Sequence, residues 1–143
     1  MNDSLFYTCS LIEFMGRCTK NHRKDIVRYL GNDIERIYNY QDIFHCEPIA
    51  KVSDDFIKRH QIPEGSFDNI KSCQYEIPDY WDIGEVFARL IEDSYAKDEI
   101  FWGLRETYDS WIANKILNFN SDLYYQPRDY LAECYRQGKI LVV

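Results

Sequence analysis

Apolar side chains recur every three or four residues along most of this chain, and that spacing predicts a fold built from α-helices. The pattern begins at residues 4–18, where Leu5, Cys9, Ile12 and Met15 fall on one side of a helix. The same spacing predicts further helices over residues 20–31, 32–40 with an extension to 44, 48–60, 80–96, 98–118 and 126–138.

These segments predict an all-α fold, a single compact domain of six or seven short helices. A chain of 143 residues has the length of one ordinary domain. An N-terminal helical half (1–62) and an acidic C-terminal helical half (78–143) are joined by a connector (63–77) in which proline and glycine interrupt the helical pattern. We expect at most one minor extended element, in this connector or at the C-terminus. We also expect the two halves to pack together, because the connector is short and partly apolar.

Polar and special residues predict where several helices begin and end. Asn21 and Asn32 each precede an apolar run, and asparagine often caps a helix by accepting a hydrogen bond from its first turn. Gly31 and Gly138 follow predicted helices and mark their ends, and we expect Gly31 to end its helix in the left-handed conformation. Pro48 suits the first turn of the helix that follows it.

The net charge of −7 is unevenly distributed along the chain. Residues 1–62 hold nine basic and nine acidic side chains, whereas residues 63–143 hold eight basic and fifteen acidic ones. The whole negative excess therefore lies in the second part. Such a charge suits a protein that covers a basic partner. It disfavours nucleic-acid binding, because contacts from basic residues to phosphates supply most of the affinity there.

The C-terminal half carries the candidates for binding a partner protein. These are Asp82, Glu85, Glu92, Trp102, Glu106 and Asp109. The first three lie opposite the apolar stripe of one predicted helix, and the last three share a face of the next helix. Since tryptophan often anchors interfaces, they predict one acidic face with an aromatic centre. The alternative is an ordinary solvated helix surface.

A basic cluster in the N-terminal half offers an alternative functional surface. Its members are Arg17, Lys20, Arg23, Lys24 and Arg28. They flank a short pair of helices, which is the arrangement of a nucleic-acid-binding regulator. The competing interpretation is a solvated helix surface in which Glu13 and Asp25 serve as local ion-pair partners.

The segment Asp42 to Pro48 concentrates the chain's reactive side chains. Asp42 and His45 lie three residues apart and could form a catalytic pair if a nucleophile lay nearby, which would make the protein an enzyme. We favour a helix-end role, because successive residues on a helix point roughly 100° apart and do not converge on one substrate.

No residue pattern predicts a metal or a cofactor. Cys18 and His22 are four residues apart, but no second pair with the spacing of a zinc site accompanies them. Nucleotide-binding and catalytic motifs are likewise missing, so we expect neither a metal nor a cofactor. The chain shows no membrane span or signal peptide, and its five irregularly spaced cysteines fit a reducing cytoplasm.

Residues 10–57 resemble small uncharacterised helical families of bacterial proteins. The shared pattern is a first helix, a short helix that ends in Leu30-Gly31, a turn at Ile37-Tyr38 and the segment from Asp42 to His45. Such families often accompany genes for ADP-ribosyltransferase-like toxins. The resemblance therefore implies an antitoxin, immunity or accessory role, with a toxin-like enzyme as the basic partner.

Overall fold

The computed structural model describes residues 2–142, and every regular element in that range is a helix. The prediction of an all-α fold is confirmed. The described residues form nine α-helices and two short 3₁₀ helices, where six or seven helices were expected. None of these helices is long and apolar enough to cross a membrane. The elements are α1 Asp3–Thr19, α2 Arg23–Leu30, α3 Asp33–Asn39, α4 Gln41–Phe44, α5 Ile49–His60, α6 Tyr80–Ser94, η1 Lys97–Glu99, α7 Ile100–Tyr108, α8 Trp111–Ile116, η2 Leu123–Tyr125 and α9 Arg128–Gln137.

The helix count exceeds the prediction because two predicted helices are interrupted. The segment 32–44 divides into α3 and α4. The segment 98–118 divides into α7 and α8 at Ser110, which has an extended backbone (φ −90°, ψ 167°). The Ser110 hydroxyl donates to the Thr107 carbonyl at 2.7 Å, a local bond that competes with helix continuation. Tyr108 and Ile112 are nevertheless both buried, so the apolar stripe continues across the break.

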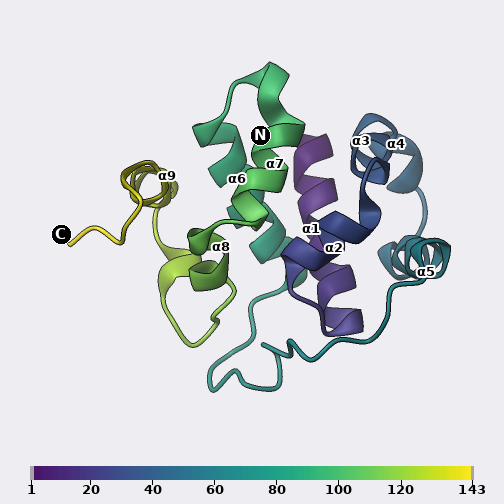
Figure 1. Cartoon of the computed structure of the whole chain (residues 1–143), viewed down its shortest axis with the longest axis horizontal. Coiled ribbons are helices and arrows are strands. Elements are labelled where there is room, and N and C mark those ends of the chain that lie inside the picture. Colours follow the sequence, from purple (N-terminus) through teal and green to yellow (C-terminus); the bar gives the residue numbers. More distant parts are fainter. Residues whose placement is uncertain (1, 143) are drawn as a thin grey trace.

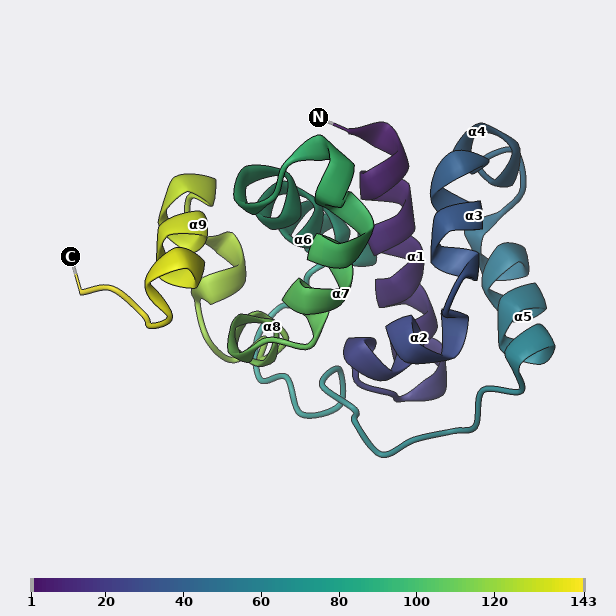
Figure 2. The same ribbon diagram turned by 45° about the horizontal axis from the view of Figure 1, so that its top comes forward.

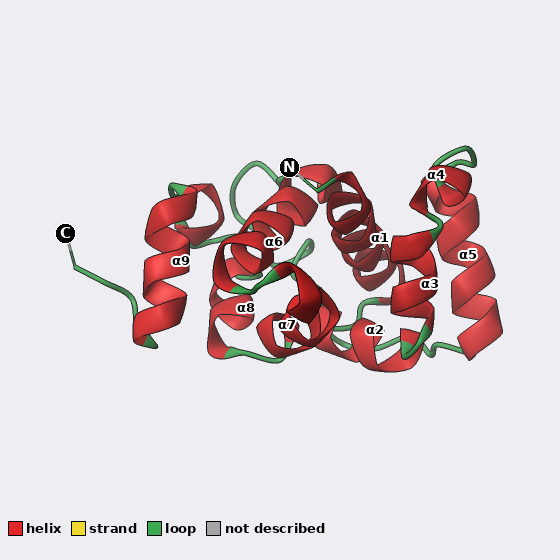
Figure 3. Cartoon of the chain, turned by 90° about the horizontal axis from the view of Figure 1, so that it is seen from above, coloured by secondary structure: helices red, strands yellow, loops and turns green. Residues whose placement is uncertain are grey.

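Helix α1 is the central element of the fold. In the view from above, α3, α4 and α5 lie on one side of it, and α6, α7 and α8 lie on the other (Figure 3). Helix α9 lies beyond α6, at the end of the molecule that also holds the C-terminus (Figure 1). Leu5, Ile12 and Met15 of α1 have no exposed surface, and their cluster of buried side chains takes in residues from both halves of the chain.

Helix α6 is held between α1 and α7. A Cβ atom on Gly84 would lie 2.1 Å from Ser10 Oγ and 2.7 Å from Ser10 Cα, so only glycine allows α1 to approach this closely. On the α7 side, Phe87 stacks on Tyr108 with ring centroids 4.3 Å apart. Phe87 and Tyr108 belong to the apolar stripes of α6 and α7, so these stripes face each other.

The connector runs beneath the helices from the end of α5 to the start of α6 (Figure 2). It follows α1 closely at two points, where Gly65 N donates to Thr19 O and Phe67 N donates to Lys20 O, both at 2.8 Å. No residue described between α5 and α6 forms a strand. The described part of the connector therefore contains no extended element of the kind that the sequence allowed, and it is an irregular segment bonded to the end of α1.

The C-terminal tail packs without forming a strand in its described part, residues 139–142. The Tyr130 hydroxyl donates to the Leu141 carbonyl at 2.6 Å, and Leu141 is half-buried. Val143 lies outside the described residues.

The predicted helix caps are confirmed in part. His22, and not Asn21, caps α2, because its side chain accepts from Lys24 N. Asn32 precedes α3 but makes no side-chain cap hydrogen bond. Gly138 follows α9, as predicted, and it has the left-handed conformation. Gly31 ends α2 with a positive φ of 53°, but its ψ of −126° lies outside the left-handed helical region.

Candidate functional site

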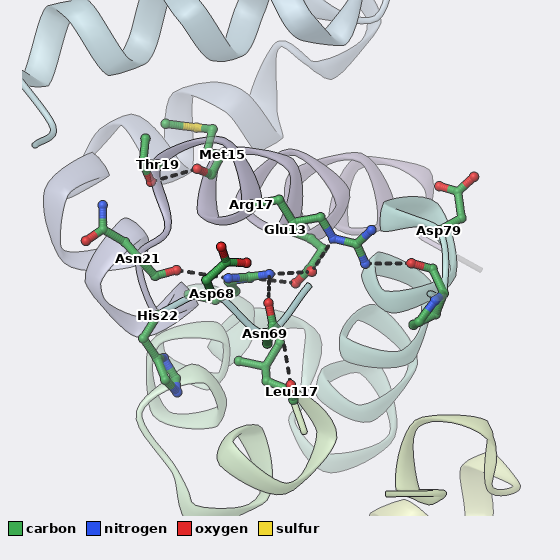
Figure 4. Close-up of polar contacts among 12 residues, drawn as sticks. Glu13, Met15, Arg17, Thr19, Asn21, His22, Asp68, Asn69, Asp79 and Leu117 are labelled. Atoms are coloured by element: carbon green, nitrogen blue, oxygen red, sulfur yellow. Dashed lines mark hydrogen bonds and ion pairs between the residues drawn. The ribbon is translucent and has the colours of Figure 1, made fainter. Parts of the chain in front are cut away.

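A buried network of charged side chains lies where α1, α2 and the connector meet (Figure 4). Arg23 of α2 donates from Nε to Glu13 Oε1 at 2.9 Å and from Nη2 to Glu13 Oε2 at 2.8 Å. Arg17, one turn further along α1, donates from Nε to Glu13 Oε2 at 2.8 Å. The side chains of Arg23 and Glu13 are 0% and 1% exposed. Charges removed from water in this way need protein partners for nearly all of their polar atoms.

Asn69 and backbone carbonyls bond the remaining donors of this network. Arg23 donates to the Asn21 carbonyl at 2.9 Å and to Asn69 Oδ1 at 3.1 Å. Asn69 in turn donates to the Leu117 carbonyl at 2.9 Å, just beyond α8. We call Glu13, Arg17, Arg23 and Asn69 the buried network. It joins α1, α2, the connector and the segment after α8.

Electrostatics keeps Glu13 ionised inside the protein. Burial on its own would raise the pKa of Glu13, but the guanidinium groups of Arg23 and Arg17 outweigh it and hold that pKa below its ordinary value. Gly16 provides the space for the pair, since a Cβ atom there would lie 2.3 Å from Arg23 Cδ. Both oxygens of Glu13 are occupied by arginine, so the network has a structural role.

The predicted basic cluster is divided by this network. Arg17 and Arg23 bond to Glu13, and Arg23 cannot reach a phosphate because its side chain has no exposed surface. Lys20 pairs with Glu64 at 3.3 Å, and Arg28 pairs with Asp109 at 2.9 Å. Lys24 is half-buried at the start of α2. The five residues therefore do not form one basic surface.

Asp42 lies in α4 and His45 directly follows that helix, and both are exposed. Asp42 Oδ1 accepts from Ile43 N at 3.1 Å, and the Asp42 carbonyl accepts from the Cys46 thiol at 3.3 Å. The His45 ring packs edge-on against Tyr7, with centroids 6.2 Å apart. The contacts of both residues are those of a helix end, which is the role that we favoured for them.

His22 is already engaged by the protein through both ring nitrogens. Nδ1 accepts from Lys24 N at 3.0 Å, and Nε2 is hydrogen-bonded to Asn114 Oδ1 at 2.7 Å. Cys18 is exposed on α1. Within residues 2–142 no three side chains of the kinds that bind metals lie close enough together to hold an ion.

The structure divides the predicted partner-binding residues between different surfaces. Asp82 and Glu85 line a cleft between α6, η2 and α9. Glu106 and Asp109 line a separate groove between α2 and α7. The six residues therefore do not surround a common centre.

The two remaining candidates, Trp102 and Glu92, line neither the cleft nor the groove. Trp102 is 58% exposed and packs edge-on against Tyr95, with ring centroids 5.5 Å apart. Glu92 is half-buried, and its Oε2 atom has no hydrogen-bond partner among the described residues. Trp102 is thus an exposed aromatic side chain at the start of α7. It does not form an aromatic centre between the carboxylates of α6.

The cleft between α6, η2 and α9 is the strongest candidate for a binding surface, and we call it the acidic cleft. Its volume is about 310 Å³, at the lower end of the range for ligand pockets. Asp82 and Glu85 line it from α6, and Tyr124 and Tyr125 line it from η2. The two tyrosine rings are nearly perpendicular, at 86°, with centroids 5.0 Å apart. Tyr125 is 66% exposed, so its ring lies open to solvent at the cleft.

An ion pair fixes the wall that α9 contributes. Arg128, the first residue of α9, donates to both carboxylate oxygens of Asp93 on α6, at 2.9 and 2.7 Å. The hydroxyls of Tyr95 and Tyr135 are hydrogen-bonded to each other near the other end of α9. These two contacts hold α9 beside α6 and so define the cleft.

Carboxylates outnumber guanidinium groups around the acidic cleft. The six carboxylates that line it or act on its tyrosine and arginine side chains are Asp82, Glu85, Glu76, Glu92, Asp93 and Asp129. The two guanidinium groups are Arg89, paired with Glu85 at 2.9 Å, and Arg128. The lining itself holds two carboxylates, Asp82 and Glu85, and two guanidinium groups, so the negative excess comes from the four carboxylates around it. The pKa of Tyr124 is raised by burial and then by negative groups that include Glu76 and Asp82.

The sequence did not predict Tyr124, Tyr125 or Arg128 as site residues. The stretch around η2 has no helical spacing, so nothing indicated that it would lie against α6. The available signal was a pair of adjacent tyrosines in the acidic half of the chain, directly before Gln126-Pro127.

Comparison of the chain with protein-family models, with curated proteins and with solved structures finds no match.

Proposed function

We propose that this is a non-catalytic binding protein that covers a basic partner protein, and that the acidic cleft is its contact surface. The observation that carries the proposal is the joint presence, at one cleft, of carboxylates and a tyrosine pair of which Tyr125 is exposed. The field of the cleft attracts positive side chains, and that attraction speeds association at low salt.

Exposed apolar side chains near the cleft support a protein partner. Tyr75 and Ile77, at the end of the connector, are 67% and 43% exposed. Gln74 N donates to Asn120 Oδ1 at 2.7 Å, which places this part of the connector beside the segment that leads into η2. Large exposed side chains in this part of the connector are suited to act as interface anchors, because burying them on binding removes apolar surface from water.

The resemblance of residues 10–57 supplies the proposed class of partner, a toxin-like enzyme, and with it an antitoxin, immunity or accessory role. All five cysteines are free, and Cys9 and Cys134 are buried. Burial raises the pKa of Cys9 to about 12, so this thiol stays protonated and unreactive. Free thiols of this kind agree with the cytoplasmic setting that we propose.

The proposal is tested with a fluorescently labelled peptide of alternating glycine and basic residues. Its affinity is measured by anisotropy at low salt for the wild type and for the double variant Asp82→Asn, Glu85→Gln. We expect the variant to bind about ten-fold more weakly, because two carboxylates of the cleft lose their charge.

The matched control is Asp54→Asn, Asp55→Asn on α5. These two carboxylates are exposed, and each is paired with a basic side chain, Asp54 with Lys58 and Asp55 with Lys51. The control changes the net charge by the same amount. Equal weakening by both double variants would show that the peptide senses only the overall charge, and it would exclude the acidic cleft as a specific site.

A further inference from the structure

We infer that the acidic cleft is selective for a guanidinium group, so that an arginine side chain of the partner enters between the tyrosine pair and the carboxylates of α6. This inference rests on the proposed function and names the chemistry of its contact. It follows from the tyrosine rings, from the unused carboxylate oxygens and from the ion pairs that the cleft already contains.

The tyrosine pair forms an aromatic corner suited to a cation. Tyr124 and Tyr125 stand at 86° with centroids 5.0 Å apart, so a group that lies on one ring face meets the other ring or its edge. Arginine stacks on aromatic faces through its planar guanidinium group, which combines cation–π attraction with flat contact. The exposure of Tyr125 leaves a ring surface available for this contact.

Helix α6 presents two carboxylate oxygens without hydrogen bonds at the same cleft. Asp82 Oδ2 accepts from Asp79 N at 3.3 Å, and Glu85 Oε1 is held by Arg89 at 2.9 Å. No described residue donates to Asp82 Oδ1 or to Glu85 Oε2. Residues three apart share one face of a helix, so both oxygens are open to a donor that enters from solvent.

Arg128 shows how this surface binds a guanidinium group. Its side chain forms two parallel hydrogen bonds with Asp93, the geometry in which a planar fork matches a carboxylate. A lysine ammonium lacks this fork and is more strongly hydrated, so it loses more on leaving water. An arginine of the partner therefore gains both from Asp82 and from the stacking surface, whereas a lysine gains mainly from charge.

The experiment compares two labelled peptides of equal length and charge, one with glycine and arginine alternating and the other with glycine and lysine alternating. Binding is measured by anisotropy for the wild type, Asp82→Asn, Tyr125→Ala and the control Tyr40→Ala. Tyr40 is 54% exposed at the start of α4, so its loss removes a similar open ring elsewhere. Far-ultraviolet circular dichroism and thermal melts establish that each variant is folded.

We expect the wild type and Tyr40→Ala to bind the arginine peptide about five-fold more tightly than the lysine peptide. We expect Tyr125→Ala to lose this preference, and Asp82→Asn to weaken both peptides and the arginine peptide more. Equal affinity for the two peptides, with binding that still depends on Asp82, would overturn the guanidinium selectivity and leave the proposed function standing. Binding that is indifferent to Asp82 and Glu85 would overturn both.

Discussion

The buried network and the acidic cleft are built from the same kinds of side chain, carboxylates beside arginines. In the buried network both oxygens of Glu13 accept from arginine, and the pair is closed to solvent. In the acidic cleft Glu85 uses one oxygen, Asp82 bonds only weakly to the start of its own helix, and Tyr125 beside them is exposed. What separates a structural charge cluster from a binding surface here is the number of unused polar atoms that solvent can reach.

The comparison is tested most strongly by the substitution Glu13→Gln. It leaves Arg23 buried and charged beside a neutral partner, so we expect the free energy of unfolding to fall by about 3–5 kcal/mol. Urea unfolding followed by circular dichroism measures the change. The same substitution in the cleft, Glu85→Gln, removes a half-exposed pair and should cost less than about 1 kcal/mol. Similar losses at the two sites would show that burial does not distinguish these clusters.

The second prediction disturbs the buried network without changing any charge. Gly16→Ala places a methyl group where Arg23 Cδ lies 2.3 Å away, so the arginine or α1 must shift. We expect a loss of about 1–3 kcal/mol from this crowding, reduced by up to about 1 kcal/mol because alanine favours helix. Since the cause is steric, the loss should be the same in low and high salt. An unchanged or raised stability would mean that Arg23 relocates freely.

The sequence predicted the helices of the fold more accurately than the break between two of them. Helical spacing identified α5, α6 and α9 well, because each buries one continuous stripe, and it also identified α1, although that central helix is buried on most of its sides. It joined α7 to α8 in one helix, because burial continues across the break that Ser110 makes with a local hydrogen bond. Spacing along the chain records which residues face the core, and it does not record where the backbone turns between them.

The candidate site was predicted less completely, for a physical reason. Sequence analysis found Asp82 and Glu85 on the outer side of α6, but a cleft depends on which segment packs beside that side. It also grouped Arg23 with surface lysines, although burial beside Glu13 removes it from the surface. The sequence shows which residues are charged, whereas tertiary packing determines whether a charged side chain pairs with another residue of the chain or stays open to solvent.

The third prediction removes an arginine from each of the two sites, where the first prediction neutralised a carboxylate. Arg128→Met breaks the pair with Asp93, whose side chains are 40% and 28% exposed, so we expect a stability loss of at most about 1 kcal/mol. Arg23→Met should cost several times more, because it leaves Glu13 buried with only Arg17. Removing Arg128 also makes the cleft more negative, so the basic peptide should bind the Arg128→Met variant at least as tightly as wild type. Weaker binding would mean that the peptide needs the α9 wall that the pair of Arg128 and Asp93 fixes.

The smallest predicted effect is a dependence of stability on pH through His22. Burial lowers the pKa of His22 below 6.5, and nearby Lys24 and Arg23 add to this, while Asn114 and Asp25 oppose it. Geometry agrees, because Nδ1 accepts from Lys24 N and a proton there would face that N–H group. A histidine with a depressed pKa in the folded state favours its neutral form. Its contribution is therefore complete above pH 6.5 and declines as the pH falls from 6.5 towards the lowered pKa.

His22→Asn isolates this contribution, because asparagine can still cap α2 but does not titrate. We expect the wild type to lose stability between pH 6.5 and 5, measured by urea unfolding at fixed ionic strength, and His22→Asn to show a flatter profile over that interval. Glu13 acts in a different window, since its depressed pKa makes its contribution decline only as the pH falls below 4.5. Glu13→Gln should therefore keep the slope above pH 5 that His22→Asn removes. If the stability of wild type and of His22→Asn changes equally with pH, the pH dependence belongs to other groups. The contact of His22 with Asn114 of α8 then has no role in it.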